Sequence, residues 1–339
     1  MKIQDILKYI FSIFLAGILL WYVLKEQNIK EVAESIKDLH WGWLILSSLT
    51  AILSHYFRGL RWGLMLKPLN LKTSNSNLFM ATMSGYAGNV IIPRFGEFFR
   101  CGILQKLSGI PAKTSFGAVV IERAIDLVVF IILFSIAFFS QFDILYQMVL
   151  PFLEGNEAQM NQKFILLGAI LLFFITGIFI LYKVRDRLSK TKIYRTIHSL
   201  ILGVIEGMQA VFKLKRKEFI IYIAYTIAIW LCYFYMSYVV FKVLDETAHL
   251  SLFVGFVMMM MSGLGMVIPT PGGTGSVHFF ASQTLMAYGI SATTSIAYAL
   301  VMHTSQTVMI LTVGGISIII ANFKKGHQQT TLEIQNEAQ

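Results

Sequence analysis

Long apolar segments, separated by short polar ones, dominate the sequence. A helix needs about 20 mostly apolar residues to cross the hydrocarbon core of a bilayer. Two apolar runs, 78–93 and 251–269, are shorter than that, and each ends at a proline with a glycine soon after it. Six other ranges approach or exceed the required length, and we predict a spanning helix in each: 6–24, 41–58, 116–139, 163–182, 218–242 and 292–321.

The composition supports a bilayer as the natural solvent. Hydrophobic residues make up 56% of the chain and charged residues only 14%, whereas soluble domains carry about 25% charged residues. The formal net charge is +10, but the basic residues lie between the apolar runs. We therefore interpret them as topology signals and contacts with anionic lipids, and expect no nucleic-acid partner.

The distribution of basic residues predicts the orientation of the chain. Basic residues far outnumber acidic ones in 183–217, and Lys324 and Lys325 follow the last apolar segment, so both regions are expected in the cytoplasm. We predict a multi-pass protein of an inner or plasma membrane with both termini cytoplasmic. Segment 78–113 then starts and ends inside, and segment 251–290 starts and ends outside. Each is a hairpin, either re-entrant or made of two tilted spans.

The same order of elements occurs twice, with opposite orientation. Each half reads span, link, span, hairpin with Ile-Pro-x-x-Gly, span, which is typical of an inverted-topology repeat. The repeats cover about 6–139 and 163–321 of one transmembrane domain, 1–325. Residues 326–339 are expected to form a disordered cytoplasmic tail. Range 191–213 has apolar residues at helical spacing and is expected to be an amphipathic surface helix on the cytoplasmic leaflet.

Irregular backbone at membrane depth is tolerated where protein buries it or water reaches it, so the two proline breaks predict a polar cavity. Arg94, Glu97 and Arg100 follow the first break. The two arginines either clamp a lipid phosphate, with Glu97 orienting one of them, or act only as topology markers. In the second case, Glu97 offsets the dipole of a helix N-terminus.

The second break, 269–276, combines prolines, glycines and hydroxyl side chains. Its glycines let backbone N–H groups approach a ligand, and the next helix begins there, which favours an anion such as phosphate. The alternative is a tight turn that binds nothing. The candidate binding residues are Thr270, Gly272, Gly273, Thr274, Ser276 and, in the following helix, His278.

Glu122, Arg123 and Asp126 lie near the start of the span 116–139. Charged side chains within a membrane are expensive, so we expect these residues to pair with cations, for which Arg94, Arg100 and Arg58 are the candidates. Glu122, Arg123 and Asp126 form either a structural ion-pair network or part of a substrate or proton path. The polar and aromatic residues at the end of the second span are interpreted as interfacial anchors: His55, Arg58, Arg61 and Trp62.

No motif of a conventional enzyme is present: the sequence has no P-loop, no Gly-x-Ser-x-Gly, no His-Glu-x-x-His and no paired Cys-x-x-Cys. We expect no catalytic residue, metal or cofactor in this chain.

The ordered set of motifs resembles the lysylphosphatidylglycerol synthase transmembrane-region family, the flippase-like integral membrane proteins. The matching pieces are Arg61-Trp62, Asn89, Pro93–Glu97 with Arg100, the cluster at 122–126, and Pro269–Gly275. The resemblance implies the membrane half that moves a modified lipid across the bilayer, without the soluble aminoacyltransferase domain. His278 stands where the family suggests an acidic residue, which implies a different lipid preference.

The resulting functional hypothesis is a flippase-like translocator of a phospholipid or a lipid-linked head group, with membrane lipids as its partners. One alternative is a membrane subunit of an aminoacyl- or glycosyl-lipid enzyme system that works with a separately encoded lipid-modifying enzyme. The other is a secondary transporter of a small solute.

Overall fold

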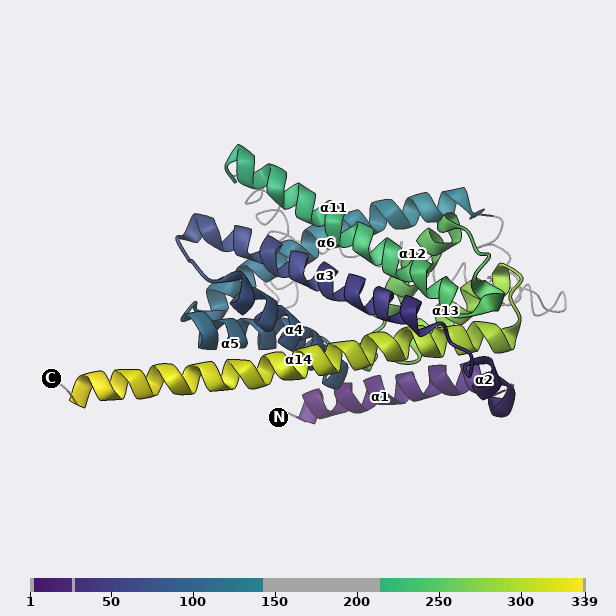
Figure 1. Ribbon diagram of the computed structural model, residues 1–339, viewed down its shortest axis with the longest axis horizontal. Coiled ribbons are helices and arrows are strands. Elements are labelled where there is room, and N and C mark those ends of the chain that lie inside the picture. Colours follow the sequence, from purple (N-terminus) through teal and green to yellow (C-terminus); the bar gives the residue numbers. More distant parts are fainter. Residues whose placement is uncertain (1–2, 26–27, 143–213, 338–339) are drawn as a thin grey trace, which may run out of the picture.

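Helices connected by short turns make up the part of the chain that the structure describes. The computed structural model describes residues 3–25, 28–142 and 214–337, and no strand occurs among them, so the predicted all-α class is confirmed. The long helices run roughly along one axis (Figure 1). In chain order the helices are α1 (Ile3–Leu24), α2 (Ile29–Ser35), α3 (Trp41–Leu66), η1 (Lys67–Leu69), α4 (Asn75–Ile91), α5 (Gly96–Ser108), α6 (Ala112–Ser140), α11 (Arg216–Val239), η2 (Val240–Val243), η3 (Asp245–Thr247), α12 (Leu252–Val267), η4 (Pro271–Gly273), α13 (Ser276–Ala287) and α14 (Ala292–Glu337).

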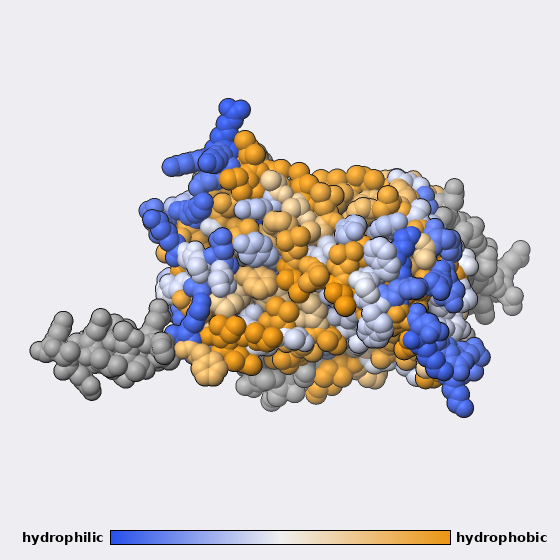
Figure 2. All heavy atoms as spheres, in the orientation of Figure 1, coloured by the Kyte–Doolittle hydropathy of each residue, from blue (hydrophilic) through white to orange (hydrophobic). Residues whose placement is uncertain are grey.

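Five of the six predicted spans fall on long helices, namely α1, α3, α6, α11 and α14. Two stretches, Arg216–Val243 and Ala292–Lys324, are long and apolar enough to cross a membrane, and α1 together with α2 is a third candidate. Apolar side chains cover the middle of the visible face, and hydrophilic ones gather at its two ends (Figure 2). The protein is therefore an integral membrane protein. The predicted span 163–182 and the predicted surface helix 191–213 lie outside the described residues.

Both short apolar runs form helices that begin at a serine cap. The Ser74 hydroxyl accepts a hydrogen bond from the Asn77 N–H at the start of α4. The Ser251 hydroxyl accepts one from the Val254 N–H at the start of α12. Such a cap satisfies one of the N–H groups that have no partner inside the helix.

Both helices also end for the same reason. A residue that precedes proline is pushed out of helical geometry by a steric clash with the ring. Ile92, before Pro93, has ψ 116°, and Ile268, before Pro269, has ψ 131°. After each proline the chain turns and forms a second helix. α4 with α5, and α12 with α13, are therefore helical hairpins.

Glycines allow the first hairpin to close tightly. A Cβ atom on Gly96 would lie 1.9 Å from the Gly85 carbonyl oxygen, which is a steric overlap. The Gly96 N–H also donates to Asn89 Oδ1 at 2.7 Å, which connects the start of α5 to the last turn of α4. Only glycine fits at position 96 without moving one of the two helices.

The tips of the two hairpins meet. In Figure 1, α4 and α5 lie toward the end of the bundle where the chain terminates, and α12 and α13 lie toward the opposite end. A Cβ atom on Gly272, in η4, would lie 3.4 Å from the Cα atom of Val90, in the last turn of α4. An Arg94 Nη2 donor lies 3.5 Å from the Val267 carbonyl oxygen. The two breaks are therefore in direct contact.

The long helices α3 and α11 pack against each other in opposite directions. The His40 N–H, before α3, donates to the Val243 carbonyl beyond α11 at 3.1 Å. At the other end, Lys67 lies 3.9 Å from Glu218. These contacts place the charged end of α3 beside the start of α11.

The last helix is longer than the predicted span. α14 continues to Glu337 and includes most of the range for which the sequence predicts a disordered tail. Gly326 is the only strong helix breaker in that range, and a single glycine costs a helix only about 1 kcal/mol.

Candidate functional site

A cluster of seven charged side chains lies between α3, α5 and α6. One carboxylate oxygen of Asp126 accepts a hydrogen bond from Arg58 Nη1 at 2.6 Å, and the other accepts one from Arg61 Nη2 at 2.7 Å. Glu122 accepts from Arg100 Nη2 at 2.6 Å and lies 3.7 Å from Arg61 Nε. A looser pair, Arg123 with Glu97 at 3.6 Å, extends the cluster. We call this set the charge cluster: Arg58, Arg61, Glu97, Arg100, Glu122, Arg123 and Asp126.

The centre of the charge cluster is removed from the surface. Arg61 and Glu122 have no exposed area, and Arg100 keeps only 2%. The Arg100 guanidinium lies 4.6 Å from the centre of the Trp62 ring, and that of Arg61 lies 5.5 Å from the Tyr222 ring. Aromatic faces attract cations and so replace part of the lost hydration.

The second half of the chain completes this site. Tyr233 of α11 accepts a hydrogen bond from Arg58 at 3.0 Å, and Thr226 of α11 accepts one from Arg61 at 3.2 Å. Thr226 also donates to the carbonyl of Tyr222 in its own helix. Helix α11 therefore joins α3, α5 and α6 around the arginines.

The cluster carries one more positive than negative charge. Four guanidinium groups face three carboxylates. Besides Glu122 Oε1, four nitrogen atoms of the cluster are buried without a hydrogen-bond partner: Nε of Arg58, Arg61, Arg100 and Arg123. A buried, surplus cation with spare donors favours the approach of an anion, because unpaired charge in a low-dielectric environment is costly.

Arg94 and Arg100, the two arginines that the sequence places at the first break, occupy different environments. Arg100 is buried, paired with Glu122 and stacked on Trp62. Arg94 is exposed, and its hydrogen bond to the Val267 carbonyl is long. Its φ of 63° lies in the left-handed region that side chains other than glycine rarely adopt.

Exposed apolar side chains lie next to both breaks, on the two hairpins that Arg94 connects. Ile91 is 60% exposed and Phe95 is 42% exposed on the first hairpin, and Met266 and Val267 are each 56% exposed on the second. An arginine on such a surface has donors available for a ligand. Of the two candidate phosphate ligands, Arg94 is the accessible one.

The second break is held by its own hydrogen bonds. The hydroxyls of Thr270 and Ser276 lie 2.9 Å apart, and Ser276 donates to the Gly273 carbonyl at 3.1 Å. The N–H groups of Gly273 and Thr274 donate to carbonyls of Thr270 and Pro271. These N–H groups, which were expected from the sequence to face an anion, are thus used inside the turn.

Two histidines attach the second break to the helices around it. The Gly275 N–H donates to His278 Nδ1 at 3.2 Å. His303 Nε2, on α14, lies 2.9 Å from the Gly272 carbonyl. Gly272 and Gly275 have φ of 57° and 81°, which the turn requires. All candidate residues of the second break therefore lie in one compact, bonded turn.

The interpretation of Arg58, Arg61 and Trp62 as interfacial anchors is wrong. Arg61 and Trp62 are fully buried, Arg58 keeps 3% exposure, and His55, which was part of the same interpretation, is also buried. The physical reason is that the acids of α6 and the hydroxyls of α11 supply partners in the interior. The spacing of Ser54, Arg58 and Arg61 places them on one helical face, and this polar stripe was the signal that they point inward.

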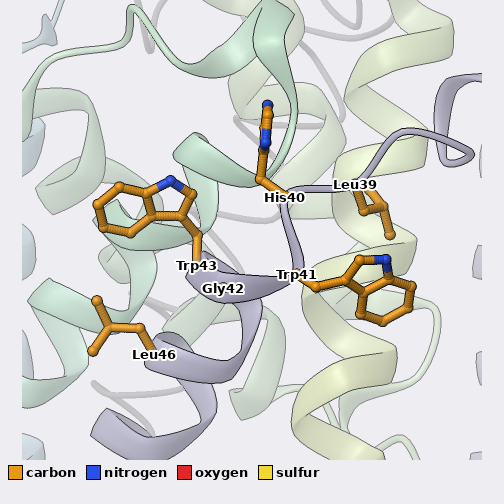
Figure 3. Close-up of a pocket in the computed structure, with 6 residues that line it drawn as sticks. All are labelled: Leu39, His40, Trp41, Gly42, Trp43 and Leu46. Atoms are coloured by element: carbon orange, nitrogen blue, oxygen red, sulfur yellow. The ribbon is translucent and has the colours of Figure 1, made fainter.

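A separate cavity of about 600 Å³ lies at the beginning of α3 (Figure 3). His40, in its lining, lies 2.9 Å from Asp245. Trp41 and Trp43 point away from each other and are 63% and 43% exposed. Exposed tryptophans are typical of the membrane–water interface, so this cavity is an interfacial feature that contains none of the candidate residues.

The family model for the lysylphosphatidylglycerol synthase TM region matches residues 9–314. The chain belongs to this family. The match spans the charge cluster and both breaks, so these features lie within the family domain. No curated protein and no solved structure matches the chain.

Proposed function

We propose that this family member is a flippase-like translocator that moves the head group of a phospholipid or a lipid-linked anion between leaflets. The observation that carries the proposal is the contact between two broken hairpins beside a surplus of buried positive charge. The path of the head group runs along this contact, where Arg94 is accessible. Thr270, Gly272, Gly273, Thr274, Ser276 and His278 form its opposite wall.

The meeting of the tips supports re-entrant hairpins. Two hairpins that enter from opposite ends and both cross the membrane completely would turn on opposite surfaces. Their breaks would then lie about 30 Å apart, the thickness of the hydrocarbon core. Val90 and Gly272 are instead in contact. This contact favours hairpins that turn back inside the membrane over hairpins that both cross it.

The directions of the helices support an inverted repeat. α3 and α11 run in opposite directions, as do α6 and α14, and the two hairpins enter from opposite ends (Figure 1). The end of α6 also meets the region before α14, because Tyr288 donates to Gln141 at 3.0 Å. This is the arrangement expected for two repeats that alternate around a central site.

Charge at the two ends supports the proposed orientation. Basic side chains gather at the end where α3 finishes and α6 begins, and we assign this end to the cytoplasm of a cell membrane, together with both termini. The basic residues there are Lys67, Lys72, Lys106, Lys113, Lys215, Arg216, Lys217 and Lys324.

The charges of the site favour a phosphate-bearing substrate. Arg94 donates to the phosphate, while Glu122 and Asp126 hold the buried arginines in place. Arg123 and Glu97 are half-buried, and their loose pair suits a head group that carries both signs of charge.

A second candidate function follows from the family description, which names a synthase. In that case the chain is the membrane subunit of a lipid-modifying system, and a separately encoded enzyme supplies the chemistry. Dependence of lipid movement on such an enzyme would favour this alternative. Uptake of a small soluble solute without any lipid effect would favour a secondary transporter.

The test is reconstitution into vesicles that contain fluorescent phosphatidylglycerol, phosphatidylethanolamine or phosphatidylcholine. The wild-type protein is expected to move at least one of these lipids between leaflets. Arg94→Ala should slow the movement about tenfold or more, because a hydrogen bond to a charged group contributes about 1.5–3 kcal/mol. Arg94→Lys should retain part of the rate.

Lys72→Ala is the matched control, because it removes one exposed positive charge far from both breaks. It should leave the rate unchanged. No movement of any of the three lipids by the wild-type protein, or equal rates for Arg94→Ala and Lys72→Ala, would contradict the proposal.

A further inference from the structure

His278 and His303 hold the same turn through hydrogen bonds of opposite polarity. A carbonyl oxygen only accepts, so His303 Nε2 carries the proton that it donates to Gly272. A backbone N–H only donates, so His278 Nδ1 is the unprotonated acceptor for Gly275. The geometry of the closed turn therefore fixes both tautomers and requires His278 to be neutral.

A proton has different consequences at the two rings. On His303 it would add to Nδ1, and the bond from Nε2 to the Gly272 carbonyl would remain. On His278 it must add to Nδ1, where a new N–H would face the N–H of Gly275. Two donors cannot hydrogen-bond to each other, so only the proton on His278 breaks the turn.

Among the side chains that the structure describes, the helices packed around the pair offer few other titratable groups. The described side chains of α1, all of α4, α12 and α13, and α14 before Lys324 include no Asp, Glu, Lys or Arg. Besides the two histidines, the titratable groups of these helices and of the turn after α13 are the tyrosines Tyr22, Tyr86, Tyr288 and Tyr298. Arg94 of the first hairpin approaches the second break through its contact with the Val267 carbonyl.

We propose that His278 is a proton-binding site that opens the second break. A proton from water binds Nδ1 and removes the acceptor of the Gly275 N–H, and the glycine-rich turn separates from α13. The ring centres of His278 and His303 lie 4.6 Å apart, so a second proton is repelled and one proton acts per chain. The effect on lipid movement rests on the proposed function, whereas the opening of the turn does not.

The size of the effect follows from linkage. The closed turn excludes the proton, and the open turn exposes a histidine that titrates near its reference value of about 6.5. Lowering the pH therefore favours the open turn. Between about pH 7.5 and about pH 5.5 the open fraction should rise about tenfold, because the open form gains a factor of ten for each pH unit below its titration point.

Cysteine labelling measures this opening without any lipid substrate. The labelled position is Thr274→Cys. The two native cysteines, Cys101 and Cys232, are buried, and both are replaced by alanine so that only the introduced thiol can react. Its rate of reaction with a water-soluble maleimide is divided, at each pH, by the rate of an exposed Lys72→Cys reference. This ratio removes the ordinary pH dependence of the thiol.

The ratio is expected to rise about tenfold from about pH 7.5 to about pH 5.5 in the protein with both histidines. His278→Asn should abolish the rise, because the amide oxygen accepts from Gly275 and does not titrate. His303→Gln should preserve it, because the amide still donates to Gly272. A ratio that is independent of pH in the protein with both histidines, or a rise that His278→Asn retains, would overturn the proposal.

Lipid movement is then measured on the same variants. A rate that rises at low pH in the protein with His278, and does not rise in the His278→Asn variant, extends the proposal to transport. Opening without movement of any lipid would leave the proton site standing and would contradict the proposed function. Movement at a pH-dependent rate in the His278→Asn variant would assign the coupling to another group and overturn the transport part.

Discussion

The two breaks share their architecture and differ in their chemistry. Both hairpins begin at a capping serine, run as an apolar helix, stop at a proline and turn back. The region around the first break holds seven charged side chains in the charge cluster. The second break holds none and is closed by hydroxyls, backbone groups and two histidines. The two helical hairpins thus share a backbone arrangement but stabilise their buried polar groups in two different ways.

The difference indicates a division of labour. Charge pairs act over a distance and attract an ion, but they are costly to break. A hydrogen bond between neutral groups contributes little free energy to stability, so a turn held by such bonds can open. We therefore interpret the first break as the binding side of the site and the second as the moving side. This comparison can be tested by removing one contact from each region.

The largest effect is expected from Glu122→Gln. Glu122 is fully buried and compensates Arg100 at 2.6 Å and Arg61 at 3.7 Å. Removal of one partner from a buried ion pair costs about 3–5 kcal/mol, because the other charge stays buried. We expect a large drop in the thermal unfolding midpoint of the detergent-solubilised protein, or the loss of folded protein.

Glu97→Gln is the matched control, since Glu97 is partly exposed and its pair with Arg123 is long, at 3.6 Å. It should cost less than about 1 kcal/mol. If both substitutions lower the midpoint equally, the buried ion pairs of Glu122 do not stabilise the fold more than the exposed pair of Glu97 does.

The charge cluster also shows how far the sequence alone could lead. Apolar run lengths and the two Ile-Pro-x-x-Gly breaks were sufficient to predict five of the long described helices and both helical hairpins, because proline geometry and the length of an apolar run are local properties of the sequence. The acids of α6 were predicted to pair with cations, which the contacts of Glu122 and Asp126 bear out.

What the sequence did not predict depends on long-range packing. Arg61 and Trp62 sit at the end of an apolar run, where anchors are common, and only the approach of α11 makes that position interior. The two donors of the glycine turn, at Gly273 and Thr274, were expected to face a ligand. Their acceptors lie within the turn itself, and backbone torsions at glycine cannot be read from a sequence.

A smaller effect is expected from Ser276→Ala in the second break. The Ser276 hydroxyl donates to the Gly273 carbonyl and lies 2.9 Å from the Thr270 hydroxyl, which is also buried. Loss of this hydroxyl should cost about 1–2 kcal/mol, because Thr270 is left without this partner. The measurement is again the thermal unfolding midpoint.

The control for this substitution is Ser282→Ala on the same helix, α13. Ser282 is equally buried, but its hydroxyl donates only to the Phe279 carbonyl of its own helix. It should change the midpoint by less than half as much. A loss at Ser276 as large as that at Glu122 would remove the proposed distinction between a rigid and a movable break.

The smallest change in stability, and the sharpest separation of stability from function, is expected from Arg94→Gly. The left-handed φ of 63° costs a residue with a Cβ atom about 1–2 kcal/mol, while glycine gives up about 0.5–1 kcal/mol of backbone entropy on folding. The thermal midpoint should therefore stay the same or rise slightly, although the hydrogen bond to Val267 is lost. Lipid movement should fall as far as in Arg94→Ala, because both variants lack the guanidinium.

If Arg94→Gly instead lowers the midpoint clearly and both variants still move lipid, Arg94 serves to join the two hairpins, and the binding role passes to the half-buried Arg123. If the midpoint holds and movement stops, a strained arginine has been kept at the junction for the charge that it presents there.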